Sequence, residues 1–144
     1  MEPQPPQRFI NKRLVVVINK MCVAMSGGLA TTTSGIRPGA NLGFVDHVFV
    51  NELFGQPLYA DIFHQAAAYM FYIVKNHMFL DGNKRTGLAC AVTFLQWNGI
   101  RFAAFDEDAV FDFVMGVAAG ENNADLMIPI IAEWLQTLRD SPLA

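Results

Sequence analysis

The sequence predicts an all-α fold, a single domain of about six helices. Three observations support this: apolar residues recur at helical spacing, strand-like alternation is scarce, and 144 residues suit one domain. The hydrophobic fraction of 53% and the charged fraction of 16% exclude a disordered chain. We expect a flexible Pro- and Gln-rich tail over residues 1–8 and one folded domain over residues 9–144.

The first half of the chain is expected to hold three helices. A helix is predicted over residues 14–25, with an apolar stripe formed by Leu14, Ile18, Met21, Cys22 and Met25. The β-branched run at 15–18 makes a strand the alternative for this segment. Residues 26–43, rich in Gly, Thr and Pro, predict a long loop. A helix over 44–53 and a connector over 54–60 follow. Asp61 is the expected N-cap of a third helix, which runs to about Asn76. This helix is apolar on almost every side, so we expect it to lie buried at the centre of the fold.

The second half is expected to hold three more helices. Residues 77–82 predict a six-residue turn before a helix that runs from Asn83 to Asn98, with Gly99 capping its end. The acidic run at 106–108 predicts the start of the next helix. The last helix is expected to end near Arg139, with Pro129 either kinking it or lying in its first turn. The apolar stripes of these helices are Leu88, Val92, Leu95, Val110, Phe113, Val114, Val117, Ile131, Trp134, Leu135 and Leu138.

Charge and composition exclude several classes of function. A net charge of −3 argues against binding the phosphate backbone of nucleic acids, which needs a basic face. Cys22 and Cys90 lack CxxC spacing, so we expect neither a disulfide framework nor a structural zinc site, and both should behave as small hydrophobic residues. The N-terminus lacks signal-peptide order, and the longest apolar run, residues 66–74, is about half a bilayer span. We therefore expect a cytoplasmic protein that contacts no membrane.

The segment 77–85, HMFLDGNKR, is where unlike functional groups crowd together. A helix N-terminus presents unpaired N–H groups and a partial positive charge, which suit a phosphate. Gly82 would let a bulky anion approach the backbone. Lys84 and Arg85 add two cations at an end where the helix dipole disfavours them unless an anion is bound. The start of this helix is therefore a candidate phosphate site.

Three further residues of the segment complete the predicted chemistry. Asp81 is the carboxylate beside the cations and would hold a magnesium ion that bridges phosphates. His77 has a side chain whose ordinary pKa suits a general base, and Phe79 is expected to anchor the turn in the core. Each residue taken alone also has a structural explanation, but two cations at a helix start fit those explanations badly. Together the groups predict phosphoryl or nucleotidyl transfer to a hydroxyl, without a P-loop.

The segment HMFLDGNKRTG resembles the signature of the Fic/Doc superfamily, and in particular its Doc (death-on-curing) branch, H-x-F-x-D-x-N-K-R-T. Seven positions match it in order: His77, Phe79, Asp81, Asn83, Lys84, Arg85 and Thr86. The resemblance implies the all-α Fic fold, with His77 as the catalytic base and Asp81 placing Mg²⁺. It also implies that Asn83, Lys84 and Arg85, with Gly82, bind the phosphates of ATP.

The resemblance further implies a function and partners. Proteins like Doc are toxins that phosphorylate a threonine of elongation factor Tu and arrest translation, and a Phd-like antitoxin neutralises them. Lys84 stands where adenylylating Fic enzymes have glycine, and Leu88 stands where they have a second arginine. Both departures favour transfer of the γ-phosphoryl group over transfer of AMP. Gly82 is the Fic-like residue, so a Fic-type AMP transferase is the alternative, and a catalytically idle binding domain is a second one.

The connector and two further histidines lie outside the signature segment. Gln56 and Tyr59 lie in a connector that resembles the Fic flap, which aligns a target chain by strand-like pairing, although a plain loop explains them equally well. His47 and His64 have no spacing that forms a metal cluster with His77, so they are interpreted as ordinary residues.

Overall fold

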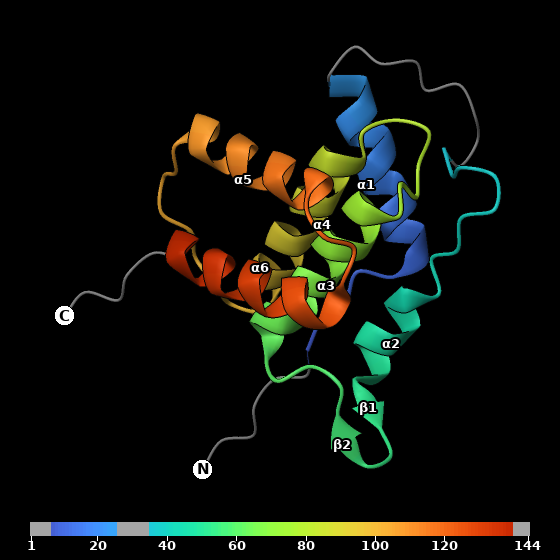
Figure 1. Ribbon diagram of the computed structural model, residues 1–144, viewed down its shortest axis with the longest axis vertical. Helices are drawn as coiled ribbons and strands as arrows, with labels where there is room; N and C mark the ends of the chain where they lie inside the picture. Colours follow the sequence, from blue (N-terminus) through green and yellow to red (C-terminus); the bar gives the residue numbers. More distant parts are fainter. Residues whose placement is uncertain (1–6, 26–34, 140–144) are drawn as a thin grey trace.

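A computed structural model describes residues 7–25 and 35–139 of the chain. Within these ranges six helices and one hairpin follow each other, which confirms the predicted all-α class (Figure 1). The elements are α1 Lys12–Met25, α2 Phe44–Val50, β1 Glu52–Leu53, β2 Gln56–Pro57, α3 Ile62–Lys75, α4 Asn83–Trp97, α5 Glu107–Ala119 and α6 Ala124–Leu138. Residues 1–6 of the expected tail and 26–34 of the expected loop lie outside the described residues.

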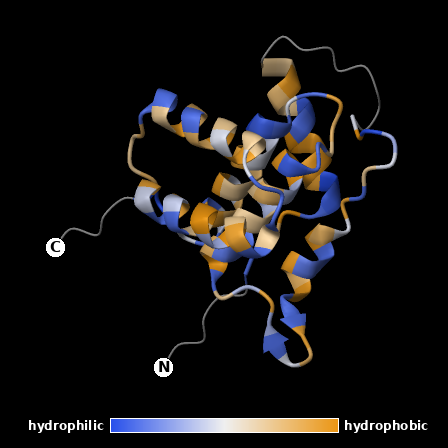
Figure 2. Cartoon of the chain, in the orientation of Figure 1, coloured by the Kyte–Doolittle hydropathy of each residue, from blue (hydrophilic) through white to orange (hydrophobic). Residues whose placement is uncertain are grey.

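Helix α3 is the centre of the fold, as its all-round apolar sequence predicts. It packs against α2, α4, α5 and α6, and ten of its 14 residues are buried. Asp61 caps its start as predicted, because Oδ1 accepts a hydrogen bond from the backbone N–H of His64 at 2.9 Å. Figure 2 shows hydrophobic residues concentrated where α3, α4 and α6 meet. Helix α1 packs on α4. Among the described residues, no helix is long and apolar enough to cross a membrane.

The close approach of α3 and α4 depends on a glycine. A Cβ atom at Gly87 would lie 2.7 Å from a methyl carbon of Val74 and 3.1 Å from the carbonyl oxygen of Met70. Any side chain at this position would push the two helices apart, because packed interiors leave no room for an extra carbon. The turn at residues 77–82 therefore begins and ends on two helices that pack tightly against each other. We call residues 77–82 the signature loop.

Helix α1 forms where predicted, but its buried face is not the predicted stripe. Val15, Asn19 and Val23 are buried, whereas Met21 and Met25 are exposed at 59% and 86%. The face is chosen by contact with α4 and the signature loop, which a count of apolar residues along one helix does not contain. The consequence is that a polar residue, Asn19, lies on the packed face.

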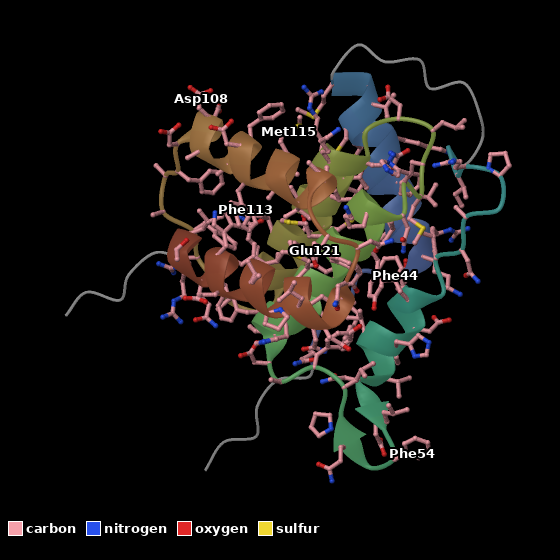
Figure 3. The ribbon with its side chains drawn as sticks, in the orientation of Figure 1. Phe44, Phe54, Asp108, Phe113, Met115 and Glu121 are labelled. Atoms are coloured by element: carbon pink, nitrogen blue, oxygen red, sulfur yellow. The ribbon has the colours of Figure 1, made fainter. Side chains whose placement is uncertain are left out.

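The predicted helix over residues 44–53 is wrong at its C-terminal end. Helix α2 stops at Val50, and Asn51 turns the chain with a left-handed φ of 50°, a conformation that asparagine tolerates well. The end of that predicted helix and the start of the predicted connector form a two-stranded antiparallel hairpin, in which Glu52 pairs with Pro57 and Leu53 with Gln56. Phe54 lies at the tip of this hairpin and is 95% exposed (Figure 3).

The C-terminal helices follow the prediction, with three differences. Leu88 and Val92 of α4 are only half-buried, because the opposite side of the helix faces α3. Pro129 lies in the second turn of α6 rather than in its first. Phe113 of α5 is also half-buried, and its ring stacks on that of Trp134 of α6 with the centroids 3.9 Å apart. Asp106 caps α5 as the acidic run predicts.

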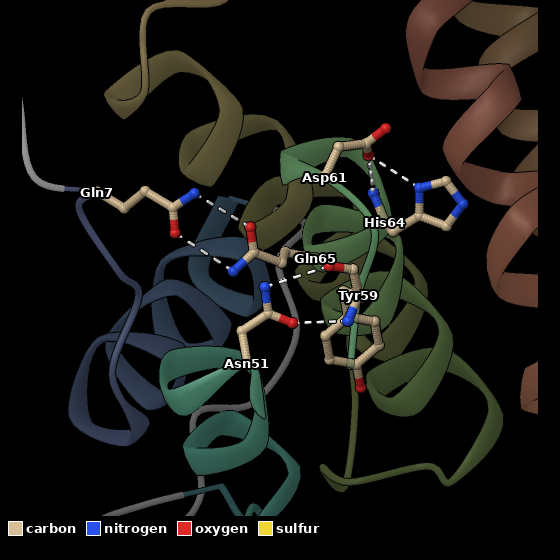
Figure 4. Close-up of polar contacts among 6 residues, drawn as sticks. All are labelled: Gln7, Asn51, Tyr59, Asp61, His64 and Gln65. Carbon is tan, nitrogen blue, oxygen red and sulfur yellow. Dashed lines mark hydrogen bonds and ion pairs between the residues drawn. The ribbon is translucent and has the colours of Figure 1, made fainter. Parts of the chain in front are cut away.

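The two described residues of the expected tail are attached to the folded domain. The backbone N–H of Arg8 donates to Oδ1 of Asn98 at 3.0 Å, and Nδ2 of Asn98 donates to the carbonyl oxygen of Arg8 at 2.9 Å. Gln7 and Gln65 exchange two side-chain amide hydrogen bonds of 3.3 Å (Figure 4). Gln7 and Arg8 therefore belong with the domain and not with a flexible tail.

Candidate active site

His77 follows the end of α3 on a strained turn. The helix ends at Lys75, whose ammonium donates to the carbonyl oxygens of Ala118 and Gly120 and so fixes this end of α3 against the end of α5. His77 lies two residues later, with a φ of 46°, which is unfavourable for a residue with a Cβ. Its side chain is exposed, and within the described ranges it makes no hydrogen bond or ion pair. The imidazole is therefore available to a ligand.

The middle of the signature loop is anchored by Phe79 and by a short pairing with residues 35–37. Phe79 is 1% exposed, as predicted, and forms an isolated antiparallel bridge with Ile36. The backbone N–H of Leu80 donates to the carbonyl oxygen of Gly35 at 3.0 Å, and the backbone N–H of Arg37 donates to the carbonyl oxygen of Met78 at 2.9 Å. The described part of the long loop thus has a role that its sequence did not reveal: it lines the signature loop.

Asn83 closes the signature loop on itself. Its Oδ1 accepts from the backbone N–H of Phe79 at 2.8 Å, and its Nδ2 donates to the carbonyl oxygen of Phe79 at 2.9 Å. We expected Asn83 to bind phosphate, and that expectation stays a prediction; both polar atoms of its side chain hydrogen-bond the backbone of Phe79. The side chain therefore positions the loop, while the second N–H of Nδ2 and the backbone N–H at the start of α4 are the donors that Asn83 can offer a ligand.

Two buried polar residues support the loop from the other side: Asn19, which the sequence analysis missed, and Thr86, which it named only as a match to the family signature. Nδ2 of Asn19 donates to the carbonyl oxygen of Asp81 at 2.8 Å and contacts Oγ1 of Thr86 at 3.1 Å. Asn19 is 3% exposed and Thr86 is fully buried. The signal that would have found Asn19 is an uncharged amide that follows the apolar run at 14–18 of α1, since a buried amide needs partners.

Helix α4 begins without a side-chain cap. Gly82 is its N-cap, with a left-handed φ of 76°, and no side chain accepts from the N–H groups of the first turn. Nor does the first turn contain an acidic residue. Lys84 and Arg85 are both exposed there, and the Lys84 ammonium makes no hydrogen bond or ion pair within residues 7–25 and 35–139. Unpaired N–H groups and two cations together make this end of α4 strongly attractive to a phosphate.

Asp81 fits the predicted role of a magnesium ligand. The carboxylate is exposed, and Oδ1 accepts a hydrogen bond from the backbone N–H of Gly82 at 2.8 Å, which fixes its orientation. No cluster of three or more His, Cys, Asp or Glu side chains suited to a metal occurs in the described part of the chain. A magnesium ion at Asp81 would therefore take most of its ligands from phosphate oxygens and water, as this ion does at many nucleotide sites.

Cys22 lies beside the same helix start. Burial raises the pKa of its thiol, while a hydrogen bond with Thr86 and the charge of Arg85 act in the opposite direction. Cys90 is fully buried, and burial raises its pKa too, with the neighbouring Cys22 adding to the effect. Both thiols are thus protonated at neutral pH and behave as the small hydrophobic residues that we predicted.

The predicted docking connector divides into an exposed and a buried residue. Gln56 is exposed in β2. Tyr59 is 8% exposed, and Asn51 holds it through its backbone, with 2.6 Å from the Tyr59 N–H to Oδ1 of Asn51 (Figure 4). Burial, followed by the neighbouring Tyr72, raises the pKa of the Tyr59 hydroxyl far above its ordinary value. The ring of Tyr59 is therefore largely unavailable for contact with a target chain, whereas Gln56 is available.

His47 and His64 lie apart from the signature loop in sequence, and both line a cavity of about 510 Å³ between α2, α3 and α6. Nδ1 of His64 lies 2.8 Å from Oδ1 of Asp61, so the ring is oriented by the helix cap (Figure 4). None of the seven signature residues lines this cavity. The two histidines therefore do not join the candidate active site.

Comparison with known proteins gives a family and two relatives. Residues 9–95, more than half of the chain, match the family model described as the Fic/DOC family. The "Protein kinase doc" of Escherichia phage P1 is 29% identical over 135 residues, covering 93% of this chain and 98% of that protein. The "Toxin Doc" of Mycolicibacterium smegmatis is 39% identical over 74 residues, which is 51% of this chain and 57% of that protein. The matched family region contains the signature loop and most of α4.

Proposed function

The chain belongs to the Doc branch of the Fic/DOC family, and we propose that it transfers the γ-phosphoryl group of ATP to a threonine hydroxyl of a target protein. The observation that carries this proposal is the uncapped start of α4, where Lys84 and Arg85 are exposed beside free N–H groups, a few residues after the exposed His77. Such a helix start binds a chain of phosphates, and an imidazole next to it can accept a proton.

The proposed reaction balances as follows. The threonine hydroxyl gives its proton to a ring nitrogen of His77, and its oxygen forms a bond to the γ-phosphorus. The bond between that phosphorus and the oxygen bridging to the β-phosphate breaks, and ADP leaves with the electron pair. The first-turn N–H groups of α4, Lys84 and Arg85 hold the phosphate charge as it spreads. Magnesium at Asp81, when bound, would neutralise part of that charge.

Transfer of AMP is the alternative, and Gly82 is the residue that favours it, since the Fic pattern has glycine there. In that reaction the α-phosphorus is attacked and pyrophosphate leaves. The surroundings of Gly82 weaken this argument, because its left-handed φ and a Val23 methyl carbon 3.1 Å from the place of a Cβ demand glycine for structural reasons alone. Lys84 and Leu88, in contrast, both depart from the adenylylating pattern.

We propose that the protein is the toxin of a toxin–antitoxin pair in the cytoplasm. The target would be elongation factor Tu, modified so that translation stops, and a Phd-like antitoxin would act in trans. The name of the mycobacterial relative supports the toxin assignment. An apolar stripe on α1, formed by Val17, Met21 and Met25 at intervals of four residues, is exposed and suits a partner chain.

The direct test is labelling of a cell extract with purified protein and ATP that carries the label on either the γ- or the α-phosphate. We expect one major labelled protein with γ-labelled ATP and none with α-labelled ATP. His77→Ala should abolish labelling, whereas His47→Ala, which replaces an exposed histidine outside the site, should not. Label that arrives only from the α-position would establish AMP transfer instead.

The remaining alternative, an idle binding domain, predicts a different set of results. Wild-type protein would then transfer no label from either form of ATP, and cells that express it would grow normally. Mass spectrometry of proteins modified after brief expression identifies the target, because the added mass distinguishes a phosphate from AMP.

A further inference from the structure

A small apolar groove adjoins the phosphate-binding start of α4. It lies between α4 and α5, which pack side by side (Figure 1), and encloses about 230 Å³. Its walls are almost entirely apolar carbon, from Leu88 of α4, Phe105 before α5, and Val110, Phe111 and Val114 of α5. The charged residues that line the same groove are Lys84 and Arg85 of α4 and Glu107 at the start of α5. We call this feature the α4–α5 groove.

The aromatic residues of the groove are open to solvent. Phe111 is 58% exposed and Phe105 is 40% exposed, although a phenylalanine gains free energy by leaving water. Such an exposed aromatic pair beside two cations suits a ligand with one flat apolar end and one strongly anionic end. A volume below the about 300–1,000 Å³ of pockets for drug-sized ligands suits a single aromatic ring system.

We propose that the α4–α5 groove binds the nucleobase of the nucleoside triphosphate. This inference rests on the proposed function and adds to it the place where the base stacks, on Phe105 and Phe111. The ribose and phosphates would then run from the groove past Lys84 and Arg85 to the first turn of α4. Charge decides this arrangement, because the phosphates need the cations and the base needs the apolar wall.

A comparison of the two cavities supports the choice of this groove. The cavity of about 510 Å³ near α2 and α6 is larger, but none of the signature residues lines it. The α4–α5 groove shares Lys84 and Arg85 with the phosphate site, so the base and the phosphates of one nucleotide can occupy both at once.

The groove also explains why a leucine occupies position 88. Leu88 is half-buried and forms part of the apolar wall, at the position where adenylylating enzymes have an arginine. An arginine there would place a charge in the groove and fill it. With the base in this groove, the γ-phosphate is the end of the nucleotide that lies farthest from α5 and is presented to the signature loop.

The experiment compares the binding of ATP with that of inorganic tripolyphosphate, each with Mg²⁺, by titration calorimetry of the full chain. Phe111→Ala should raise the Kd for ATP about tenfold, the ratio that corresponds to a base–aromatic stacking contact of about 1.4 kcal/mol. The Kd for tripolyphosphate should change less than about twofold, because the phosphate site is intact. Phe111→Trp should restore ATP binding, and Phe49→Ala, which removes an equally exposed ring on α2, should leave both affinities unchanged.

Three outcomes would overturn the inference. If Phe111→Ala and Phe105→Ala both bind ATP as the wild type does, while γ-label transfer persists, the base lies elsewhere and only this inference fails. If the variants lose affinity for ATP and tripolyphosphate equally, the groove acts through the structure of the phosphate site and not through the base. If the wild type binds neither ATP nor tripolyphosphate and transfers no label, the proposed function and this inference fail together.

Discussion

Replacement of Gly82 by alanine measures how strongly the start of α4 is constrained. Gly82 has a left-handed φ of 76°, and a residue with a Cβ pays about 1–2 kcal/mol to adopt that conformation. The added carbon would also lie 3.1 Å from a methyl carbon of Val23 and 3.4 Å from Nδ2 of Asn19, both buried side chains. Overpacking of this kind costs about 1–3 kcal/mol. We therefore expect Gly82→Ala to lower the free energy of unfolding by about 2–5 kcal/mol.

Gly99 provides the matched control. It has a left-handed φ of 92°, but a Cβ there would meet nothing within 4 Å. Gly99→Ala should therefore lose only the backbone part, about 1–2 kcal/mol. Urea denaturation followed by circular dichroism measures both losses, since a domain of this size is expected to unfold in two states. Equal losses for the two variants would refute the contact of Gly82 with α1.

Three other substitutions test the polar contacts that hold the fold. Asn19→Leu leaves the partly buried carbonyl of Asp81 and the buried hydroxyl of Thr86 without this donor, so we expect urea denaturation to show a loss of about 2–4 kcal/mol. Wild-type stability of the variant would contradict this role. Tyr69→Phe removes the hydroxyl that donates to the carbonyl oxygen of Ile10 at 2.7 Å and accepts from the backbone N–H of Ile10 at 3.1 Å. Urea denaturation should show that this variant loses about 1–3 kcal/mol of the free energy of unfolding. Burial alone would raise the pKa of Asp61, but hydrogen bonds from His64 outweigh it and lower the pKa. Stability from Asp61 is thus present above its ordinary pKa near 4 and is lost as the pH falls through the lower folded value, so Asp61→Asn should flatten the acid limb of a stability–pH profile.

The parts of the fold that the sequence predicted well are those governed by local rules. Helix α3 is apolar on every side and capped by Asp61, and both features act within a few residues of each other. The acidic cap of α5 and the glycine that ends α4 are similarly local. The signature segment was recognisable because its functional residues are consecutive, so no tertiary contact was needed to bring them together.

The sequence predictions failed, or were silent, where a segment distant in the sequence determines the local structure. The end of α2 was placed too late because the hairpin at 52–57 forms through pairing that periodicity does not describe. That the amide of Asn83 bonds the backbone of the residue four positions earlier was not predicted either, because the sequence does not state the shape of that turn. The partner of that turn at residues 35–37 was interpreted only as loop.

The sequence by itself determined the helical class, the central helix and the family to which the signature segment belongs, because periodicity, caps and motif order depend on neighbouring residues. Only the tertiary structure decided which face of α1 is buried, that Asn19 supports the signature loop across 62 residues, and that an apolar groove opens beside Lys84 and Arg85. These features depend on which surfaces meet when the helices pack, and packing joins residues that no local pattern relates.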